Sequence, residues 1–298
     1  MKIFYPAYYS EFKCIADKCS HSCCVGWEIG VDEETASRYA VLGGELGDEI
    51  RSHLCDDVIS MCDDGRCPFL DADGLCRIIS AIGEDYTSVI CREHPRFYHR
   101  VGQRVEGGLG LSCEEACRII LSSDAYADFT TGEHDCLVGD ETDFDSVSHR
   151  DYIYGILLNT DLSYIEKKSL IIGKYGLGDI SFTDGDFCAA FDELEYLDDD
   201  HRHIMLVDGI YEGNEYDAVL QRFMAYLVFR HVSIAEGYDN LRARVGFCLL
   251  LCAIAESNIC RGGLDFSGVC EVARIISEEI EYSEDNTAAL IFEIESRI

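Results

Sequence analysis

The sequence predicts a mainly helical protein with a small cysteine-rich α+β portion at its N-terminal end. Eleven of the 17 cysteines lie within the first 117 residues, which indicates a separate metal-binding or redox portion there. The chain holds only three prolines, whereas good helix formers are plentiful. Apolar residues then recur at helical spacing through the second half. No Rossmann-type core is visible, and we expect none.

Length and composition bound the domain organisation. A chain of 298 residues with 48% hydrophobic residues can bury a substantial core and form one large or two ordinary domains. We expect a cysteine-cluster domain at residues 1–122 and a helical domain at residues 151–298. The acidic, weakly periodic segment 123–150 between them is predicted to be a linker or a loosely held surface segment.

The charge balance is strongly acidic, with 57 acidic against 24 basic residues and a formal net charge of −33. Such a field repels phosphates and anionic lipids, so we expect neither nucleic acid nor membrane as a partner. It attracts a lysine-bearing protein surface or a cationic ligand. The alternative interpretation is that the acidic surface only keeps the protein in solution.

The ends and the apolar stretches predict a cytoplasmic protein. The first residues lack the apolar region of a signal peptide, and the longest apolar stretch, 245–255, is too short to span a membrane. Thiols stay reduced in the cytoplasm, where clustered cysteines usually indicate metal or redox chemistry rather than disulfides.

The N-terminal third contains short elements marked by caps and turns. Residues 1–13 are rich in aromatics and predict an extended segment. Asp32 is the expected N-cap of a helix over 33–42, and a second short helix is expected over 47–54. Residues 61–76 carry Asp-Asp-Gly and Asp-Ala-Asp-Gly, which predict a hairpin.

The next segment predicts strands and then a helix. Arg77 to Ala81 is expected to be a brief helix or strand, and residues 97–111 two strands joined around Gly107-Gly108. Ser112 is the expected cap of a helix over 113–122, whose first turn is favoured by two glutamates. Farther on, apolar spacing predicts four helices, over residues 217–233, 241–257, 266–282 and 286–298.

The thiols carry the chemistry. Cys14, Cys19, Cys23 and Cys24 lie within eleven residues, and Cys67, Cys76, Cys91 and Cys113 follow. Zinc sites usually pair cysteines with a gap of two residues, but no Cys-x-x-Cys occurs in this chain. Four thiolates can also hold an iron–sulfur cluster, whose ligand spacing is more permissive. Iron–sulfur is therefore favoured over zinc, and the adjacent Cys23 and Cys24 favour a multi-atom cluster or two neighbouring sites.

Other cysteines and polar groups are expected to have structural rather than functional roles, with a few left open. Single cysteines in apolar patterns predict small buried side chains, at Cys55, Cys136, Cys188, Cys248, Cys252, Cys260 and Cys270. Cys62 and Cys117 stand between the two groups. The glycines of 173–178 lack the context of a nucleotide-binding loop, and His201 with His203 is expected on a solvated surface. Arg92, Glu93 and His94 could tune a cluster, move protons or form surface pairs.

Four ordered motifs carry a family resemblance. They are Phe12-Lys-Cys…Cys19-Ser-His-Ser-Cys-Cys-Val-Gly-Trp27, Cys67-Pro-Phe-Leu…Gly74-Leu-Cys76, Cys91-Arg-Glu-His-Pro-Arg96 and Leu111-Ser-Cys-Glu-Glu-Ala116. Together they resemble the flagellin lysine-N-methylase family and, in part, a wider group of cysteine-cluster domains described as zinc- or iron-chelating. Glu114 follows Cys113, where the family commonly has proline.

The resemblance implies an S-adenosyl-L-methionine-dependent protein-lysine N-methyltransferase that acts on flagellin and carries an iron–sulfur cluster, expected to be 4Fe-4S. Its ligands are implied to come from Cys14, Cys19, Cys23, Cys24, Cys67, Cys76, Cys91 and Cys113. Zinc stays the alternative metal. The residues name no catalytic base and no donor-binding position.

A second hypothesis comes from a different class of function. A non-enzymatic metal-chelating or redox module would also hold zinc or iron but would bind no methyl donor. The acidic charge favours docking of a lysine-rich partner but does not activate an amine, because acidic neighbours raise the pKa of a lysine.

Overall fold

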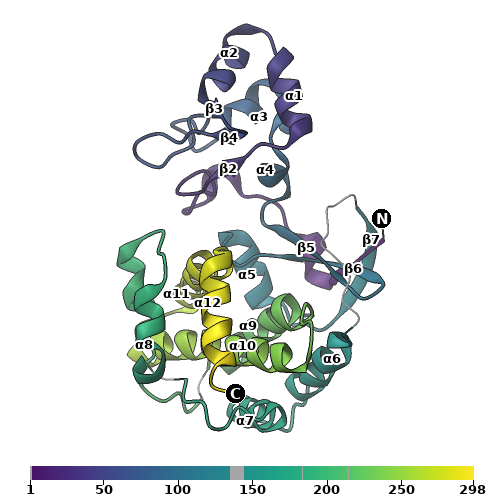
Figure 1. Cartoon of the computed structure of the whole chain (residues 1–298), viewed down its shortest axis with the longest axis vertical. Helices are drawn as coiled ribbons and strands as arrows, with labels where there is room; N and C mark the ends of the chain where they lie inside the picture. The colour runs from purple at the N-terminus through teal and green to yellow at the C-terminus, as the bar shows by residue number, and fades with distance from the viewer. Residues whose placement is uncertain (1, 135–143, 183, 214) are drawn as a thin grey trace. The chain divides into compact units, whose positions relative to one another are not determined.

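The computed structural model describes residues 2–134, 144–182, 184–213 and 215–298, and the chain packs into two compact units (Figure 1). The thiol unit, as we call it, is residues 13–96, and the helical unit is residues 1–12 with 97–298. This division differs from the predicted segments, because the first strand pairs with strands beyond residue 100. The predicted linker contributes one of those strands, and residues 135–143 of it lie outside the described residues.

The thiol unit consists of short elements around a small core. Its elements are η2 (Ala16–Lys18), β2 (Ile29–Gly30), α1 (Glu33–Val41), α2 (Gly44–His53), β3 (Leu54–Cys55), β4 (Val58–Ile59), α3 (Arg77–Ile82), η3 (Glu84–Tyr86) and α4 (Val89–Glu93). The strands pair in the order β2-β4-β3. Eight buried side chains form the core: Ile29, Val31, Tyr39, Ile50, Ile59, Cys67, Phe69 and Ile78.

Local signals in this unit are partly confirmed. Asp32 caps α1 as predicted, and its carboxylate accepts from the Thr35 amide at 3.0 Å. The predicted hairpin over 61–76 is wrong, because its turns join no strands. Asp71 instead accepts from the amides of Asp73 and Leu75, and this turn leaves only an isolated bridge between Leu70 and Cys76.

The helical unit combines one sheet with a helical bundle. Its first elements are β1 (Lys2–Pro6), η1 (Ala7–Glu11), β5 (Arg96–Val101), β6 (Arg104–Leu109), α5 (Glu114–Ser122) and β7 (Phe129–Glu133). The strand order is β5-β6-β1-β7, in which β1 runs parallel to β6 and antiparallel to β7. The fold is mainly α with a small strand content, as predicted, and no Rossmann core occurs among the described residues.

The helices follow along the chain and bury the main core. They are α6 (Ser146–Leu157), α7 (Tyr164–Tyr175), α8 (Asp184–Glu193), η4 (Asp199–Ile204), α9 (Asp217–Leu227), η5 (Val228–Val232), α10 (Tyr238–Arg261), α11 (Phe266–Ile276), η6 (Ser277–Glu281) and α12 (Glu284–Glu295). The four predicted helices are confirmed as α9 with η5, α10, α11 with η6, and α12. The elements η5 and η6 are π-helical segments.

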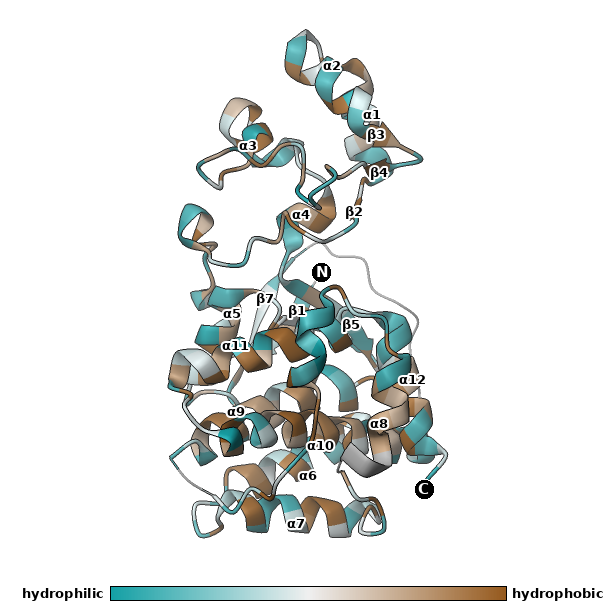
Figure 2. Cartoon of the chain, turned by 90° about the vertical axis from the view of Figure 1, so that its left-hand side faces the viewer, coloured by the Kyte–Doolittle hydropathy of each residue, from teal (hydrophilic) through white to brown (hydrophobic). Residues whose placement is uncertain are grey.

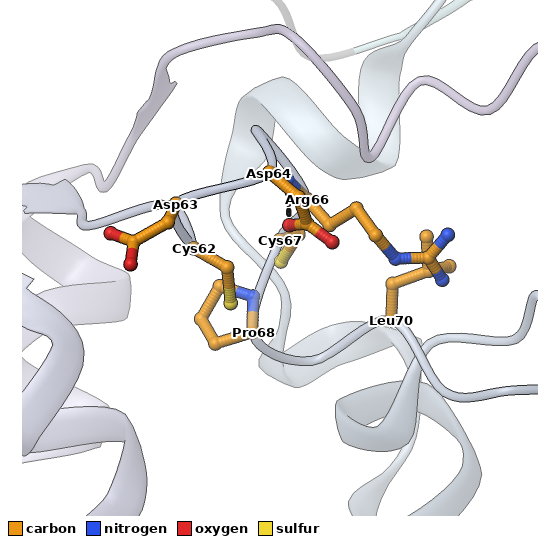
Figure 3. Close-up of a pocket in the computed structure, with 7 residues that line it drawn as sticks. All are labelled: Cys62, Asp63, Asp64, Arg66, Cys67, Pro68 and Leu70. Carbon is orange, nitrogen blue, oxygen red and sulfur yellow. Dashed lines mark hydrogen bonds between the residues drawn. The ribbon is translucent and has the colours of Figure 1, made fainter.

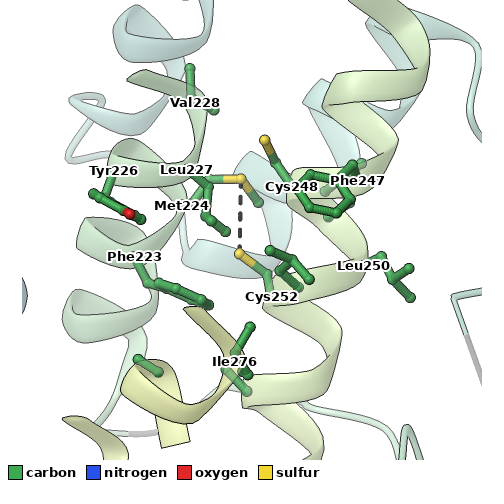
Figure 4. Close-up of a cluster of buried hydrophobic side chains, with 14 of the residues drawn as sticks. Phe223, Met224, Tyr226, Leu227, Val228, Phe247, Cys248, Leu250, Cys252 and Ile276 are labelled. Carbon is green, nitrogen blue, oxygen red and sulfur yellow. Dashed lines mark hydrogen bonds between the residues drawn. The ribbon is translucent and has the colours of Figure 1, made fainter. Parts of the chain in front are cut away.

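Helix α10 is the centre of the helical unit (Figure 2). It is the one helix among the described residues that is long and apolar enough to cross a membrane, yet 89% of its apolar window is buried. Cys248 and Cys252 on α10 face the neighbouring helix α9, where the Met224 sulfur lies 3.9 Å from Cys252 Sγ (Figure 4). Both thiols are buried, as predicted, and α10 is a core helix.

Two predictions at the sheet are corrected. Gly107 and Gly108 lie inside β6, and the turn falls at Gly102, whose φ is +53°. A Cβ on Gly108 would come 2.3 Å from the Phe97 ring, so the glycine makes room for that side chain. Helix α5 begins at Glu114 with Cys113, not Ser112, as its N-cap, and no side chain caps it.

Candidate metal centre

Four thiols from separate segments converge in the thiol unit. Cys24 precedes β2, Cys67 follows the loop after β4, Cys76 is the N-cap of α3, and Cys91 lies in α4. Electrostatic interactions link every pair among the four, so each thiol lies within electrostatic range of the other three. We call these four residues the thiol centre.

Backbone hydrogen bonds fix the loops that bear these thiols. The Cys67 amide donates to the Cys24 carbonyl at 2.8 Å, which joins the first two ligand loops directly. One step farther, the Gly26 amide donates to the Gly65 carbonyl at 2.9 Å. The Ser88 hydroxyl lies 3.2 Å from Cys91 Sγ and donates to it. Hydrogen bonds to a ligand sulfur are a common means of orienting it and tuning its metal.

The thiols differ in their acidity. A hydrogen bond from Cys23 is the largest influence on Cys24 and, helped by Ser22 and the Arg66 charge, lowers its pKa to about 7 against the effect of burial. Burial raises the pKa of Cys67 to about 12 and also raises the pKa values of Cys76 and Cys91. Cys24 is therefore the most acidic thiol of the centre. A cationic metal centre would favour all four thiolates, because deprotonation supplies the ligand charge.

The spacing of the thiols distinguishes between metals. Four sulfurs bound to one zinc ion at 2.3 Å lie about 3.8 Å apart. Among the described residues, no three of the thiols come within 4.8 Å of one another. An iron–sulfur cube spreads its four cysteines over separate iron atoms and so holds them farther apart. A single zinc ion would require these thiols to move closer together, and the iron–sulfur cluster stays a prediction.

The other predicted ligands occupy different surroundings. Cys14 and Cys19 flank η2, where Cys14 Sγ accepts from the Ala16 amide at 3.4 Å and Cys19 Sγ donates to the His21 carbonyl at 2.9 Å. Cys23 is exposed and contacts the centre through Cys24. Cys113 belongs to the helical unit, where it packs partly against the main core. Their assignment as ligands stays a prediction.

The cysteines expected to be buried differ in their exposure. Cys248 and Cys252 are buried and Cys270 is half-buried, whereas Cys55, Cys188 and Cys260 are exposed, which corrects the prediction for these three. Cys55 lies in β3, Cys188 in α8 and Cys260 near the end of α10, and a cysteine on the solvent side of such an element gives the same sequence pattern as a core residue. Cys136 lies outside the described residues. Cys117 is buried in α5 and its thiol donates to the Cys270 carbonyl at 3.2 Å.

The charged residues beside Cys91 have structural partners. Arg92 donates to the Thr87 carbonyl, which ties α4 to the preceding turn. Burial lowers the pKa of His94 to about 4, so this histidine is neutral at physiological pH.

His201 and His203, which the sequence assigned to a solvated surface, lie in the helical unit, where His203 is exposed and His201 is half-buried. His201, Glu278 and Glu279 bring their ligand atoms within 4.8 Å of one another. The Glu279 carboxylate, however, already accepts from His201 Nδ1 at 2.6 Å and from the amides of Leu197 and Asp198. This cluster joins η4 to η6.

Two hollows in the thiol unit adjoin the segments that carry the centre. One, of about 350 Å³, is lined by Cys62, Asp63, Asp64, Arg66, Cys67, Pro68 and Leu70 (Figure 3). The other, of about 550 Å³, is lined by Gly26, Trp27, Glu28, Val58, Ile59, Ser60, Met61 and Gly65. Both hollows are open to solvent, and both border the loop that ends at Cys67.

Comparison with known proteins identifies relatives of this chain. It is 32% identical over 136 residues to the flagellar biosynthetic protein FliU of Salmonella muenchen, and the match covers 41% of this chain and 79% of that protein. It is 31% identical over 136 residues to the lysine-N-methylases of Salmonella typhimurium and Salmonella choleraesuis. Those matches cover 41% of this chain but only 33% of each methylase.

Two further comparisons gave no match. No family model matches the chain, and no solved structure is significantly similar to it. The names of these relatives agree with the family that the cysteine motifs resemble. The match extends over most of the FliU protein. The chain belongs to the flagellin lysine-N-methylase family.

Proposed function

We propose that this protein is an S-adenosyl-L-methionine-dependent lysine N-methyltransferase that acts on flagellin and carries an iron–sulfur cluster. The observation that carries the proposal is the convergence of Cys24, Cys67, Cys76 and Cys91 in a chain related to lysine-N-methylases. The name of its FliU relative refers to flagellar biosynthesis, which favours a flagellar protein as substrate.

The four thiols are the ligand set of a 4Fe-4S cluster, which supplies a redox-active iron centre when bound. Cys24 is the most acidic of the four, because a hydrogen bond from Cys23 lowers its pKa to about 7. Cys67, Cys76 and Cys91 would bind iron as thiolates, and their protons would be released to solvent. The Ser88 hydroxyl then serves as a hydrogen-bond donor to Cys91 Sγ and orients that ligand.

The acidic charge of the chain supports a lysine-bearing substrate. A net charge of −33 attracts a cationic protein surface and accelerates its docking. Methyl transfer itself needs a neutral amine, and an acidic environment raises the pKa of a lysine. We therefore assign the acidic surface to docking and name no base.

A direct assay tests the proposal. Protein purified without oxygen is mixed with S-adenosyl-L-methionine and unmethylated flagellin, and mass spectrometry follows the added methyl groups. We expect methyl-lysine with the native protein and none with Cys67→Ser, while the exposed control Cys55→Ser keeps its activity. Metal and sulfide without methyl transfer and without donor binding would favour the alternative, a metal-chelating or redox module.

A further inference from the structure

The second hollow of the thiol unit is open to solvent and large enough to hold a small molecule. Its volume of about 550 Å³ is within the usual range for such sites, about 300–1,000 Å³. Two backbone segments form its walls and are held together at both ends. Ile29 pairs with Ile59 between β2 and β4, and the Gly26 amide donates to the Gly65 carbonyl. The hollow is therefore formed by the backbone before any ligand binds.

Glycines keep one end of this hollow open. Gly26 and Gly65 have φ values of +80° and +75°, a conformation that side-chain-bearing residues rarely adopt. A Cβ built on Gly26 meets no atom within 4 Å, so its side faces open space. The hollow at this end thus presents bare backbone to a ligand.

The lining selects a cation. Trp27, the only tryptophan of the chain, is half-buried, and the next residue, Glu28, is an exposed carboxylate. Met61 adds a polarisable thioether from the opposite segment. No lysine or arginine is among the lining residues. An indole face with a neighbouring carboxylate is a typical arrangement for binding an organic cation, through cation–π attraction and charge.

Both segments that form the hollow continue directly into residues of the thiol centre. Trp27 is three residues after Cys24, and Gly65 is two residues before Cys67. The bridge between Val25 and Arg66 joins these two segments between the hollow and the centre. A ligand in the hollow is therefore next to the loops that hold two of the four thiols.

We propose that this hollow, lined by Trp27, Glu28 and Met61, binds the methyl donor through its positively charged sulfonium. The assignment rests on the proposed methyltransferase function. S-adenosyl-L-methionine is a cation at sulfur, and its product S-adenosyl-L-homocysteine has the same shape but a neutral thioether. The site therefore favours the donor over the product, which promotes release after transfer.

The single tryptophan makes the proposal directly measurable. The metal-loaded full chain is titrated without oxygen with S-adenosyl-L-methionine and, separately, with S-adenosyl-L-homocysteine, and the Trp27 emission is recorded. We expect a saturable change with both ligands and tighter binding of the donor. A cation–π contact corresponds to about twofold to thirtyfold in affinity. Calorimetry on the same samples measures total donor binding, independently of Trp27.

Variants separate the contributions of the lining. Trp27→Leu should weaken donor binding in calorimetry by about twofold to thirtyfold, and Trp27→Phe, which keeps a ring, by less. Glu28→Gln should weaken binding of the donor more than that of the product. Glu45→Gln is the matched control, because Glu45 is an exposed carboxylate on α2 of the same unit. Iron content and circular dichroism check that each variant is folded.

The outcomes distinguish this proposal from the proposed function. Donor binding in calorimetry with unchanged Trp27 emission and an unaffected Trp27→Leu variant would overturn the site and leave the methyltransferase standing. A response of Trp27 to a lysine-containing flagellin peptide but not to the donor would assign the hollow to the acceptor and also overturn it. The absence of any donor binding to the metal-loaded protein would overturn the proposed function as well.

Discussion

The two compact units of this chain are stabilised in different ways. The helical unit is built around α10, and dozens of buried side chains from helices and sheet pack against one another. The thiol unit buries only eight core side chains among elements of two to ten residues. Small cores rarely supply enough stability alone, and natural domains of this kind add disulfides or metal. The thiol centre is the part of the molecule that can serve as this metal support.

The two units also treat polar groups differently. The thiol unit gathers four thiols around one centre, whereas the helical unit buries complete ion pairs. Glu106 is fully buried against Arg150 at 2.7 Å, and Glu281 lies 2.6 Å from His231. Loss of a bound metal would leave the thiol-bearing segments of the first unit held by backbone hydrogen bonds and the small core alone. The second unit carries its counter-charges within its own chain.

Metal removal should have the largest effect, and only on the thiol unit. Chelation of the loaded protein should unfold residues 13–96 at temperatures that leave the helical unit folded, because binding free energy is folding free energy in small metal domains. Trp27 emission reports on the thiol unit alone, and far-UV circular dichroism mainly on the helical unit. Coincident loss of both signals would contradict this difference.

Breaking the buried ion pair should be the next largest effect, in the other unit. Glu106→Gln leaves the buried Arg150 without its full counter-charge, which costs about 3–5 kcal/mol. Urea unfolding followed by circular dichroism measures this loss. The exposed pair Arg202–Asp199 is the control, and Asp199→Asn should cost less than about 1 kcal/mol. Equal losses would show that burial of the pair is immaterial.

Acid should destabilise the helical unit through the same carboxylates. Burial opposes the ionisation of Glu106, but His99 and Arg150 outweigh it and lower its pKa to about 2. Burial likewise opposes ionisation of Glu281, and Arg230 with His231 lowers its pKa to about 2. Both folded-state pKa values lie below the unfolded-state pKa of about 4.3. The two ionised carboxylates therefore make their full contribution to the free energy of unfolding above about pH 4.3.

This contribution should disappear as the pH falls from about 4.3 to about 2, by a few kcal/mol for the two groups together. Urea titrations at a series of pH values test the slope. In Glu106→Gln, the free energy of unfolding should decrease less steeply with falling pH than in the native protein. An unchanged slope would assign the acid sensitivity to other groups.

A helix cap should give the smallest effect. Ser163 and Glu166 form a reciprocal capping box at the start of α7, with the Ser163 amide donating to Glu166 at 2.8 Å. Ser163→Ala should cost about 1 kcal/mol in urea unfolding of the helical unit and leave Trp27 emission unchanged. Ser169→Ala, at an exposed position within the same helix, is the matched control and should cost less.

Local signals account for what could be predicted from the sequence. Asp32 at the start of α1 and the apolar spacing of α9 to α12 are properties of neighbouring residues, and these elements were predicted correctly. The course of β1 could not be predicted, because its partners lie about 100 and 130 residues away. Gly107 and Gly108 were predicted to form a turn, because glycine is common in turns. In the structure these glycines lie inside a strand, where a side chain would collide with Tyr98 or Phe97.

The candidate site shows the same limit. Cysteine content and motifs narrowed the ligands to eight, but spacing along the chain could not choose among them. Cys24 belongs to the thiol centre, whereas its neighbour Cys23 contacts the centre through a hydrogen bond to Cys24. The choice depends on where the loops after β4 and before α3 and α4 bring Cys67, Cys76 and Cys91. The second hollow, lined by Trp27, depends in the same way on the pairing of β2 with β4.

The most direct test of the thiol centre is the iron and sulfide content of single variants. Full-length protein is reconstituted without oxygen, and iron and acid-labile sulfide are measured for serine variants of Cys24, Cys67, Cys76 and Cys91, with Cys55→Ser as the control. We predict about four irons and four sulfides per chain in the native protein and the control, as for a 4Fe-4S cube, and a marked loss in the four variants. Zinc without sulfide, or full iron content in all four variants, would contradict the account.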